Sequence, residues 1–318
     1  MPSILSNLNL LKKYDLYAFD YIEYPHKSFW IENKFKTSDY RTACEEFASG
    51  KFFKNIQLQK NNKFMLYVHI PFCHELCSFC ICHREITSKY QRASDYLHKS
   101  LVKEIDVVSK IVNNTSEGKL EVGELYFGGG SPTYLNEIDF SFLLKKLKDS
   151  FNFSEDIDIN VEIDPRRIEI DRLYFYHEQG VNKLSFGIQD FDKKVQIAIN
   201  RIQPAALTEK LLTSDIRDKF KAVNFDLLVG LPEQTIESLK NTVSKVCEMS
   251  PDRVSLAYLH YGPKYHVHQR LMLKDGLLPD FYERKELFEE AVNILLAHGY
   301  VRTGFEHFAL PTDAVAKA

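Results

Sequence analysis

The sequence lacks the features that mark membrane and nucleic-acid-binding proteins. It contains no apolar run close to the ~18 residues that a helix needs to cross a bilayer. Its net charge of −3 gives no overall attraction to nucleic acid or to an anionic membrane. With 13 glycines, 11 prolines and no low-complexity tract among 318 residues, a long disordered linker is not expected either. No targeting segment is evident, so we expect a protein of the reducing cytoplasm.

Cysteine is also scarce, but four of the six cysteines follow one another closely, with the spacing C-x3-C-x2-C-x-C. They are Cys73, Cys77, Cys80 and Cys82. Thiolates select zinc, Cu(I) or iron–sulfur clusters. Structural zinc sites usually draw their ligands from two separated pairs, and this sequence has no second pair. A [4Fe–4S] cluster can take three thiolates from one loop, so the spacing favours a cluster over zinc. A disulfide is the least favoured interpretation for a cytosolic chain.

Apolar stretches of strand length alternate with amphipathic stretches of helix length from about residue 64 onward. Hydrophobic residues make up 44% of the chain and charged residues 27%, as in a soluble globular domain. Six strand–helix units predict an α/β fold with a parallel sheet, and they are too few for a closed eight-stranded barrel. We therefore expect an open, partial (β/α)6 TIM-like barrel. The expected strands are Phe64–Ile70, Glu124–Phe127, Ile157–Ile163, Lys183–Phe186, Asn224–Val229 and Arg253–Leu259, and the expected helices are Ser94–Val112, Phe140–Phe151, Asp192–Asn200 and Thr235–Met249.

The first 60 residues contain no recognisable chemistry. Residues 8–16 and 41–53 have helical patterns, and residues 17–25 are irregular and rich in aromatic side chains. We predict an N-terminal helical arm over residues 1–60 and a barrel domain over residues 61–318.

Polar and glycine residues lie where the predicted strands end. The cysteine loop follows the first strand, and the glycines 128–130 end the second, where the chain can approach a ligand closely and offer bare amide and carbonyl groups. Glu162 lies near the end of the third strand, Gln189 near the end of the fourth, and Asp226 inside the fifth. Chemistry in such barrels collects at the C-terminal ends of the strands, which predicts one shared site.

An ordered set of motifs resembles the radical S-adenosylmethionine (radical SAM) superfamily. Cys73-x3-Cys77-x2-Cys80 is the signature of these enzymes, and the longer string from Tyr67 to Cys82 resembles the oxygen-independent coproporphyrinogen III oxidase (dehydrogenase) branch. Further stretches match that branch in order: residues 128–133 (GGGSPT), 161–166 (VEIDPR), 185–191 (SFGIQDF), 200–201 (NR), 226–232 (DLLVGLP) and 306–309 (EHFA).

The resemblance implies a [4Fe–4S] cluster and one or two molecules of S-adenosylmethionine as cofactors. Three cysteines would bind the cluster, and Cys82 would pack under the loop without binding it. No catalytic residue is assigned. Arg201 and Asp226 could instead form a structural ion pair, and Glu162 could be a satisfied strand-end carboxylate. By this resemblance the metal ligands are Cys73, Cys77 and Cys80; Tyr67, Gly129 and Glu162 contact the cluster-bound cosubstrate; and Phe79, Gly130, Ser131, Gln189, Arg201 and Asp226 contact a second cosubstrate molecule.

The same resemblance implies an oxidoreductase that decarboxylates propionates to vinyl groups in heme (porphyrin) biosynthesis. The expected partners are a tetrapyrrole-like small molecule and a flavodoxin- or ferredoxin-like one-electron donor, with neither nucleic acid nor membrane, and the protein would be a monomer. Candidate partners for the substrate carboxylates are Arg84, Arg166 and Arg167.

The chain departs from the family pattern in three places. Asp20 stands where the family tends to have a basic residue, and His260 replaces an alanine that lies against the second cosubstrate, where it could crowd the pocket or act as an acid–base group. The sequence ends at Ala318, so we expect the family's C-terminal helical domain to be absent. These departures leave two alternatives: a related radical SAM enzyme that acts on heme or another small molecule by methyl transfer, ring opening or cyclopropanation, or a non-catalytic iron–sulfur or heme carrier.

Overall fold

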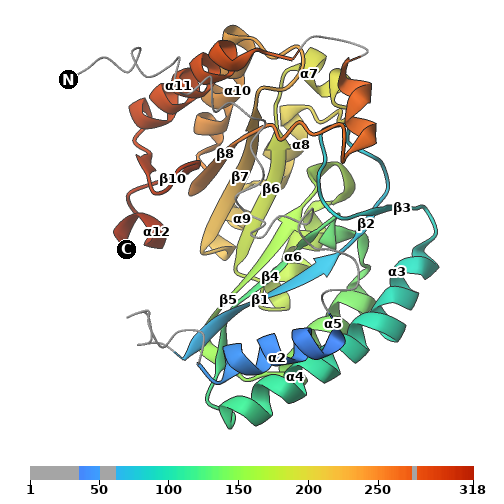
Figure 1. The fold of residues 1–318 in the computed structure, drawn as a ribbon. Helices are drawn as coiled ribbons and strands as arrows, with labels where there is room; N and C mark the ends of the chain where they lie inside the picture. The colour runs from blue at the N-terminus through green and yellow to red at the C-terminus, as the bar shows by residue number, and fades with distance from the viewer. Residues whose placement is uncertain (1–35, 51–61, 274–277) are drawn as a thin grey trace, which may run out of the picture.

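The computed structural model describes residues 36–50, 62–273 and 278–318 (Figure 1). The predicted helix at residues 8–16, the aromatic stretch at 17–25 and Asp20 lie outside the described residues. So does the end of the helix expected at 41–53, whose described part is α2 (Thr37–Ala48). The division into an arm and a barrel domain therefore stays a prediction.

Six parallel strands form the sheet in their order along the chain, as the alternating pattern predicted (Figure 1). Two short antiparallel strands, which the pattern did not predict, extend it beyond the sixth strand. The sheet thus has two ends and stays open within the described residues, which confirms the expected α/β architecture. The strands, in sheet order, are β1 (Lys63–Ile70), β4 (Glu121–Gly129), β5 (Phe153–Ile163), β6 (Lys183–Gln189), β7 (Ala222–Val229), β8 (Arg253–Tyr258), β10 (His307–Ala309) and β9 (Val301–Arg302).

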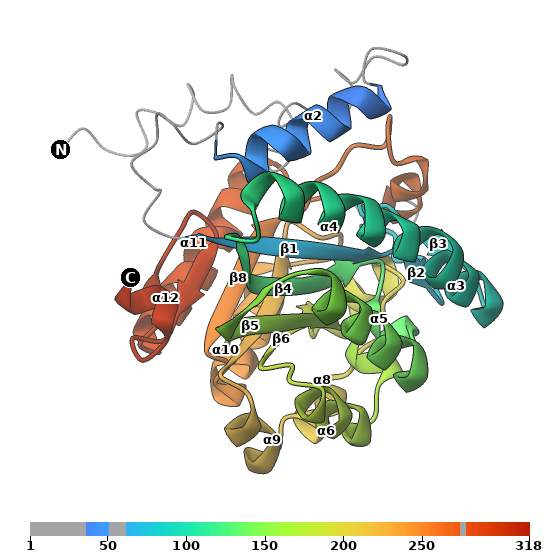
Figure 2. The same cartoon turned by 90° about the horizontal axis from the view of Figure 1, so that it is seen from below.

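Helices accompany the sheet along its length and bury its apolar residues (Figures 1 and 2). The helix predicted at 94–112 is observed over residues 90–116, with one π-helical turn at Leu97–Leu101. The structure adds helices and turns that the sequence pattern did not indicate. The helices are α3 (Tyr90–Tyr96), α4 (Val102–Ser116), α5 (Glu137–Ser150), α6 (Ile170–Glu178), α7 (Lys193–Ala198), α8 (Ala205–Leu211), α9 (Ser214–Lys219), α10 (Ile236–Met249), α11 (Phe281–Ala297) and α12 (Ala314–Lys317), with 3-10 turns at Pro132–Tyr134, Pro165–Arg167 and Val267–Leu273.

The core explains why these segments take these forms. The β4 side chains Leu125 and Phe127 are fully buried, and Phe127 packs against Phe140 of α5 with ring centroids 5.0 Å apart. Beside these buried positions, Glu124 and Tyr126 are half-buried, so the strand packs one face against the helices. Side-chain caps help to set where helices begin: Asn136 accepts a hydrogen bond from the amide of Asp139 at the start of α5.

A second, two-stranded sheet closes the cysteine loop. The strand β2 (Phe72–Cys73) pairs in parallel with β3 (Glu85–Ile86), so residues 74–84 form a loop whose two ends are held together. This small sheet follows β1 directly and places the cysteines beside the C-terminal ends of the parallel strands (Figure 1). Among the described residues, the structure contains no helix with the length and hydrophobicity needed to span a membrane.

Candidate active site

The cysteine loop is fixed by backbone hydrogen bonds as well as by its two strands. The amide of Thr87 donates to the carbonyl oxygen of Cys73 over 3.0 Å, and the amide of Cys80 donates to that of Cys77 over 3.2 Å. From the other side, the amide of Ser78 donates to the carbonyl of Ile199 over 2.9 Å. These bonds hold the loop between β2, β3 and the segment after α7.

One cavity at the C-terminal ends of the strands gathers nearly all the predicted site residues. Besides Cys73, Cys77 and Cys80, the cavity is lined by Phe79, Gly129, Gly130, Ser131, Glu162, Gln189, Arg201 and Asp226. These residues come from the cysteine loop, from four different strands or their ends, and from the segment after α7. The cavity lies where the sequence predicted one shared site, at the C-terminal ends of the parallel strands.

Tyr67 is the exception, because it does not line this cavity. Its ring stacks on that of Tyr126 with centroids 5.9 Å apart, and its hydroxyl lies 3.0 Å from Nδ1 of His69. The Tyr126 hydroxyl in turn donates to Glu162 over 3.2 Å. Tyr67 and Glu162 both lie over Gly128, where an added Cβ would be 2.9 Å from the Tyr67 ring and 2.8 Å from the Glu162 carboxyl group.

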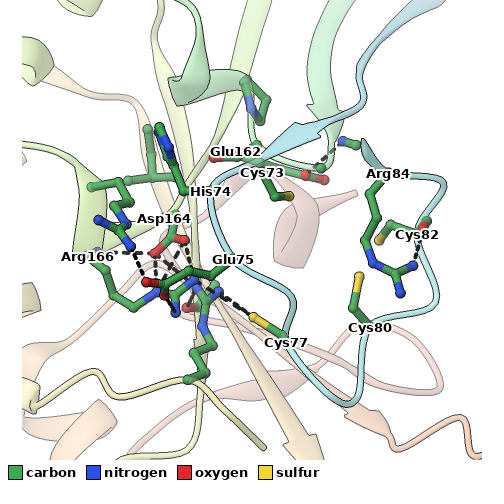
Figure 3. A pocket seen from close by; sticks show the side chains of 18 of the residues that line it. Cys73, His74, Glu75, Cys77, Cys80, Cys82, Arg84, Glu162, Asp164 and Arg166 are labelled. Carbon is green, nitrogen blue, oxygen red and sulfur yellow. Dashed lines mark hydrogen bonds and ion pairs between the residues drawn. The ribbon is translucent and has the colours of Figure 1, made fainter. Parts of the chain in front are cut away.

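The arrangement of the three thiols fits a cluster better than a single ion. Among the described residues, no three His, Cys, Asp or Glu side chains converge as a single metal ion requires. Tetrahedral zinc would need its sulfur ligands at ~2.3 Å. Instead, all three cysteines line the cavity from separate positions, and Figure 3 shows the Cys77 sulfur directed toward the guanidinium groups and away from Cys80. A [4Fe–4S] cluster, which is larger and takes its ligands at different irons, suits such spacing.

Cys82 lies in a different place from the one expected. We expected it to pack beneath the loop, but it is exposed and lines the cavity, so that expectation is wrong. A hydrogen bond from Cys82, followed by the positive charge of Arg84, lowers the pKa of Cys80 to about 6. Burial and the neighbouring thiols Cys80 and Cys77 raise the pKa of Cys73 to about 12. Cys80 is therefore more readily ionised than Cys73.

Two guanidinium groups approach the sulfur of Cys77. Nη1 of Arg201 lies 3.6 Å from it, and Nη2 of Arg166 lies 3.8 Å from it. Both arginines pair with Asp164, at 3.4 Å and 2.7 Å. Burial opposes the ionisation of Asp164, but the two guanidinium groups outweigh it and lower the pKa of Asp164 to about 2. Asp164, Arg166 and Arg201 therefore form a compact group of opposite charges on one side of the cavity, which we call the inner wall.

Arg201 does not form the ion pair with Asp226 that was one of our alternatives. Its charged partner is Asp164, and its Nη2 also donates to the carbonyl of Gly187 over 2.7 Å while Nε donates to Gln203 over 3.1 Å. A carboxylate ligand at Arg201 would thus share donors that already bind protein groups.

The carboxyl groups of Glu162 and Asp226 are both buried in the inner wall. Glu162 accepts hydrogen bonds from the amide of Gly129 over 3.1 Å and from Tyr126. Burial, and then the charge of Asp226, raise the pKa of Glu162 to about 7. Asp226 accepts from Ser185 over 2.9 Å and from Asn224 over 2.7 Å, and burial raises its pKa as well. Near neutral pH, Glu162 can therefore both donate and accept a hydrogen bond.

Gly129 and Gly130 allow a close approach of neighbouring chain segments, but their amides are already hydrogen-bonded within the protein. The amide of Gly129 donates to Glu162, and that of Gly130 donates to the carbonyl of Ile70 over 2.9 Å. Gly129 has φ +119°, and a Cβ at Gly130 would lie 2.8 Å from the backbone of Pro71 and 3.0 Å from Sγ of Cys73. Glycine at 130 is required because the cysteine loop passes so close to β4.

The three arginines proposed for substrate carboxylates line the same cavity. Arg167 pairs with Glu75 at 2.6 Å, Arg166 approaches Glu75 at 3.5 Å, and Arg84 donates to the carbonyl of Cys82 over 2.7 Å (Figure 3). The replacement residue His260 does not line the cavity, and its ring packs 6.2 Å from that of His266.

Sequence reasoning assigned no role to Asp164 or Glu75. Asp164 stands in the quoted stretch at 161–166, directly after β5, so its place at a strand end was a usable signal. Glu75 lies inside the cysteine loop and had no such signal.

Known proteins resemble this chain over most of its length. Residues 67–246 match the family model described as the radical SAM superfamily. An oxygen-independent coproporphyrinogen III oxidase of Escherichia coli (strain K12) is 37% identical over 284 residues, which cover 88% of this chain and 61% of the relative. A protein of the same name from Synechocystis sp. is 33% identical over 317 residues, covering 100% of this chain and 64% of the relative.

A solved structure gives the same result for the fold. The coproporphyrinogen III oxidase HemN from Escherichia coli, a radical SAM enzyme, matches with a TM-score of 0.78 and 35% identity, over 89% of this chain and 61% of that one. The chain spans less than two thirds of the length of these relatives.

Proposed function

The chain belongs to the radical SAM superfamily, and from that premise we propose that it is an oxidoreductase that decarboxylates the propionate side chains of a coproporphyrinogen-like tetrapyrrole. Its cofactors are a [4Fe–4S] cluster and S-adenosylmethionine. The names of the relatives support the choice of substrate class. The product would carry vinyl groups and serve heme biosynthesis.

One observation supports this proposal most strongly: the three thiols and the polar strand ends face a single cavity. In our proposal Cys73, Cys77 and Cys80 hold the cluster. Tyr67, Gly129 and Glu162 belong to the pocket of the cluster-bound S-adenosylmethionine, and Phe79, Gly130, Ser131, Gln189, Arg201 and Asp226 belong to that of a second molecule. When bound, the cluster and its cosubstrate supply one-electron abstraction of an unactivated hydrogen atom.

The chain's own residues supply charge balance and hydrogen bonds. Arg201 and Arg166 bring positive charge within 3.8 Å of the Cys77 sulfur. Glu162, with a pKa raised to about 7, can bind an amino group or a hydroxyl group of a cosubstrate. Both Glu162 and Asp226 are buried, so water competes little for these bonds.

The substrate would be held by its negative charges. The protein has no excess of positive charge overall, so an anionic substrate depends on local basic groups. Arg84, Arg166 and Arg167 bring three guanidinium groups to the cavity, and guanidinium binds carboxylates through paired hydrogen bonds. We also propose a flavodoxin- or ferredoxin-like electron donor, a monomeric state and a cytoplasmic location.

The test is anaerobic reconstitution followed by a count of iron and sulfide. The loaded, reduced protein should cleave S-adenosylmethionine to 5′-deoxyadenosine, and coproporphyrinogen III should lose carbon dioxide as measured by mass spectrometry. Zinc in place of iron, or a full cluster without cleavage, would contradict the proposal.

Heme offered in the same assay separates the alternatives. A methylated or ring-opened heme product would keep the radical chemistry and change the substrate class. Tight heme binding with no cleavage of S-adenosylmethionine would favour a carrier.

A further inference from the structure

The segment that follows β8 is hydrogen-bonded to the cysteine loop, although the two are far apart in the sequence. Nε2 of Gln269 donates to the carbonyl of Phe79 over 3.0 Å, across 190 positions. Nε2 of His268 lies 2.7 Å from the carbonyl oxygen of Cys80, across 188 positions. We call His268 and Gln269 the outer clasp. It contacts two consecutive residues of the loop, and the second of these is a proposed cluster ligand.

Gln269 anchors the outer clasp in the fold. Its side chain is fully buried, and its amide group donates a second hydrogen bond to the carbonyl of His260 over 2.7 Å. Its Oε1 accepts from the amide of Gly262 over 2.7 Å. Two carbonyl acceptors and one amide donor permit a single orientation of the side-chain amide. The position of the Phe79 carbonyl is therefore tied to the backbone of residues 260–262.

The contacts of His268 determine which ring nitrogen carries the proton. A carbonyl oxygen only accepts, so the nitrogen next to Cys80, Nε2, must be the donor. Nη2 of Arg84 lies 3.0 Å from Nδ1 and 2.7 Å from Nε2 of the same ring. With Nε2 donating to Cys80, Nδ1 is the ring nitrogen that is left to accept from the guanidinium. Nη2 lies nearer to Nε2 than to Nδ1, so Arg84 contacts the ring between its two nitrogens.

Arg84 depends on this ring for its orientation. Nη1 donates to the carbonyl of Cys82 over 2.7 Å, and Nη2 contacts His268. Nε is buried and has no hydrogen-bond partner among the described residues. Arg84 lines the cavity beside Cys80 and Cys82 (Figure 3). Without His268, the guanidinium would keep only the Cys82 carbonyl, to which a flexible side chain could donate from many positions.

We propose that His268 is a positioning residue for the cluster: its ring holds the Cys80 carbonyl and directs the Arg84 guanidinium toward the cavity. This inference rests on the cluster in the proposed function and does not depend on which substrate is used. A reduced cluster carries one more negative charge than an oxidised one. A positive charge held nearby stabilises the reduced form, because charge and hydrogen bonding around a cluster set its potential.

The experiment measures the reduction midpoint potential of the reconstituted cluster by EPR-monitored titration, together with its iron content. His268→Ala should shift the midpoint to more negative potential and change the EPR signal of the reduced cluster. His268→Gln should stay close to the wild type, because a side-chain amide can donate to the Cys80 carbonyl and accept from Arg84. The matched control is His298→Ala, since His298 is exposed and contacts the Ile294 carbonyl of its own helix.

A second variant keeps the inference testable if His268→Ala does not hold a cluster. Arg84→Gln leaves His268 in place and removes the charge, so it should produce the same negative shift. The inference is overturned if Arg84→Gln or His268→Ala keeps the wild-type midpoint potential. It is also overturned if His268→Gln shifts the midpoint potential as much as His268→Ala does. A wild-type protein that takes up no cluster would overturn the proposed function as well, which separates the two failures.

Discussion

The cysteine loop is held from two sides, and the two sides are built differently. On one side the residues Ile199, Asn200 and Arg201, which we call the inner clamp, follow α7. They contact Ser78, Leu76 and Cys77 through an amide–carbonyl bond of 2.9 Å, a side-chain bond of 2.8 Å and a guanidinium–sulfur contact of 3.6 Å. On the other side the outer clasp binds Phe79 and Cys80 through neutral side chains.

The difference lies in where each side gets its stability. The inner clamp joins a buried charge network with Asp164 and Arg166, so it should be sensitive to any change of charge. The outer clasp relies on hydrogen bonds of His268 and Gln269 with backbone carbonyls. The charged group that it contacts is Arg84. The same loop is thus fixed electrostatically at Cys77 and by neutral hydrogen bonds at Cys80.

The largest effect is expected at the ligand that the inner clamp contacts. Cys77→Ala should abolish cluster assembly, because the cluster needs three thiolate ligands and this variant keeps only two. Iron and sulfide should fall to background in the reconstituted protein, and no 5′-deoxyadenosine should form. Cys82→Ala is the matched control and should keep a full iron content. Loss of iron in Cys82→Ala as well would show that Cys82 also supplies a ligand.

The charge network itself is tested by Asp164→Asn. This change leaves Arg201 and Arg166, whose side chains are 9% and 10% exposed, without their shared carboxylate. Breaking a buried ion pair in this way costs about 3–5 kcal/mol, so we expect a loss of that order in the free energy of unfolding by urea. Asp156→Asn serves as the control, because Asp156 is 75% exposed in its pair with Lys63 and its loss should have a much smaller effect. Equal losses would contradict the proposed asymmetry between buried and surface charge.

Glu162 should make the inner wall dependent on pH. Its pKa is about 7 in the folded protein against an ordinary 4.5, so the unfolded chain ionises first as pH rises. Stability is therefore lost as pH rises from about 4.5 to about 7, by on the order of 3 kcal/mol. Glu162→Gln in the cluster-free protein should remove this loss and raise the melting temperature at pH 8 but not at pH 4.5. Glu155→Gln, at an exposed position, should leave the difference between the two pH values unchanged.

The smallest effect is expected for the outer clasp. Gln269→Leu keeps the approximate volume of the side chain. It leaves the Phe79 and His260 carbonyls and the Gly262 amide without their hydrogen-bond partner. We expect a loss of about 1–3 kcal/mol in unfolding free energy, with faster amide hydrogen exchange at residues 78–82 and little change at 185–190. Faster exchange spread evenly over both regions would show that the two sides act as one unit.

Much of the fold could be predicted because apolar periodicity and strand length are local signals. The six parallel strands were expected within a few residues of their observed bounds, and β4 and β5 proved longer at their beginnings. The short strands β9 and β10 were missed because two or three residues carry no periodicity. The helix α6 was missed although its buried Leu173 and Tyr176 are three positions apart, as on one helical face.

The site was predictable where its residues lie at strand ends. Glu162 and Gln189 could be grouped because parallel strands bring their ends to one edge of the sheet. The partner of Arg201 could not be predicted in this way, since Asp164 follows β5 and Asp226 lies inside β7, and only the geometry distinguishes them. His268 could not be predicted at all. It lies in a 3-10 turn, far in sequence from the loop that it contacts.

The pairing of β2 with β3 has a consequence for how a metal group would enter this protein. The pairing holds the two ends of the cysteine loop together through bonds that involve no sulfur ligand. Closing a flexible loop costs entropy, and here that cost is met during folding. A zinc finger, by contrast, orders its chain only when the metal arrives. We expect the loop to keep its conformation when the metal is removed. The circular dichroism spectrum should then stay nearly unchanged, and the cluster should assemble again on the same molecules.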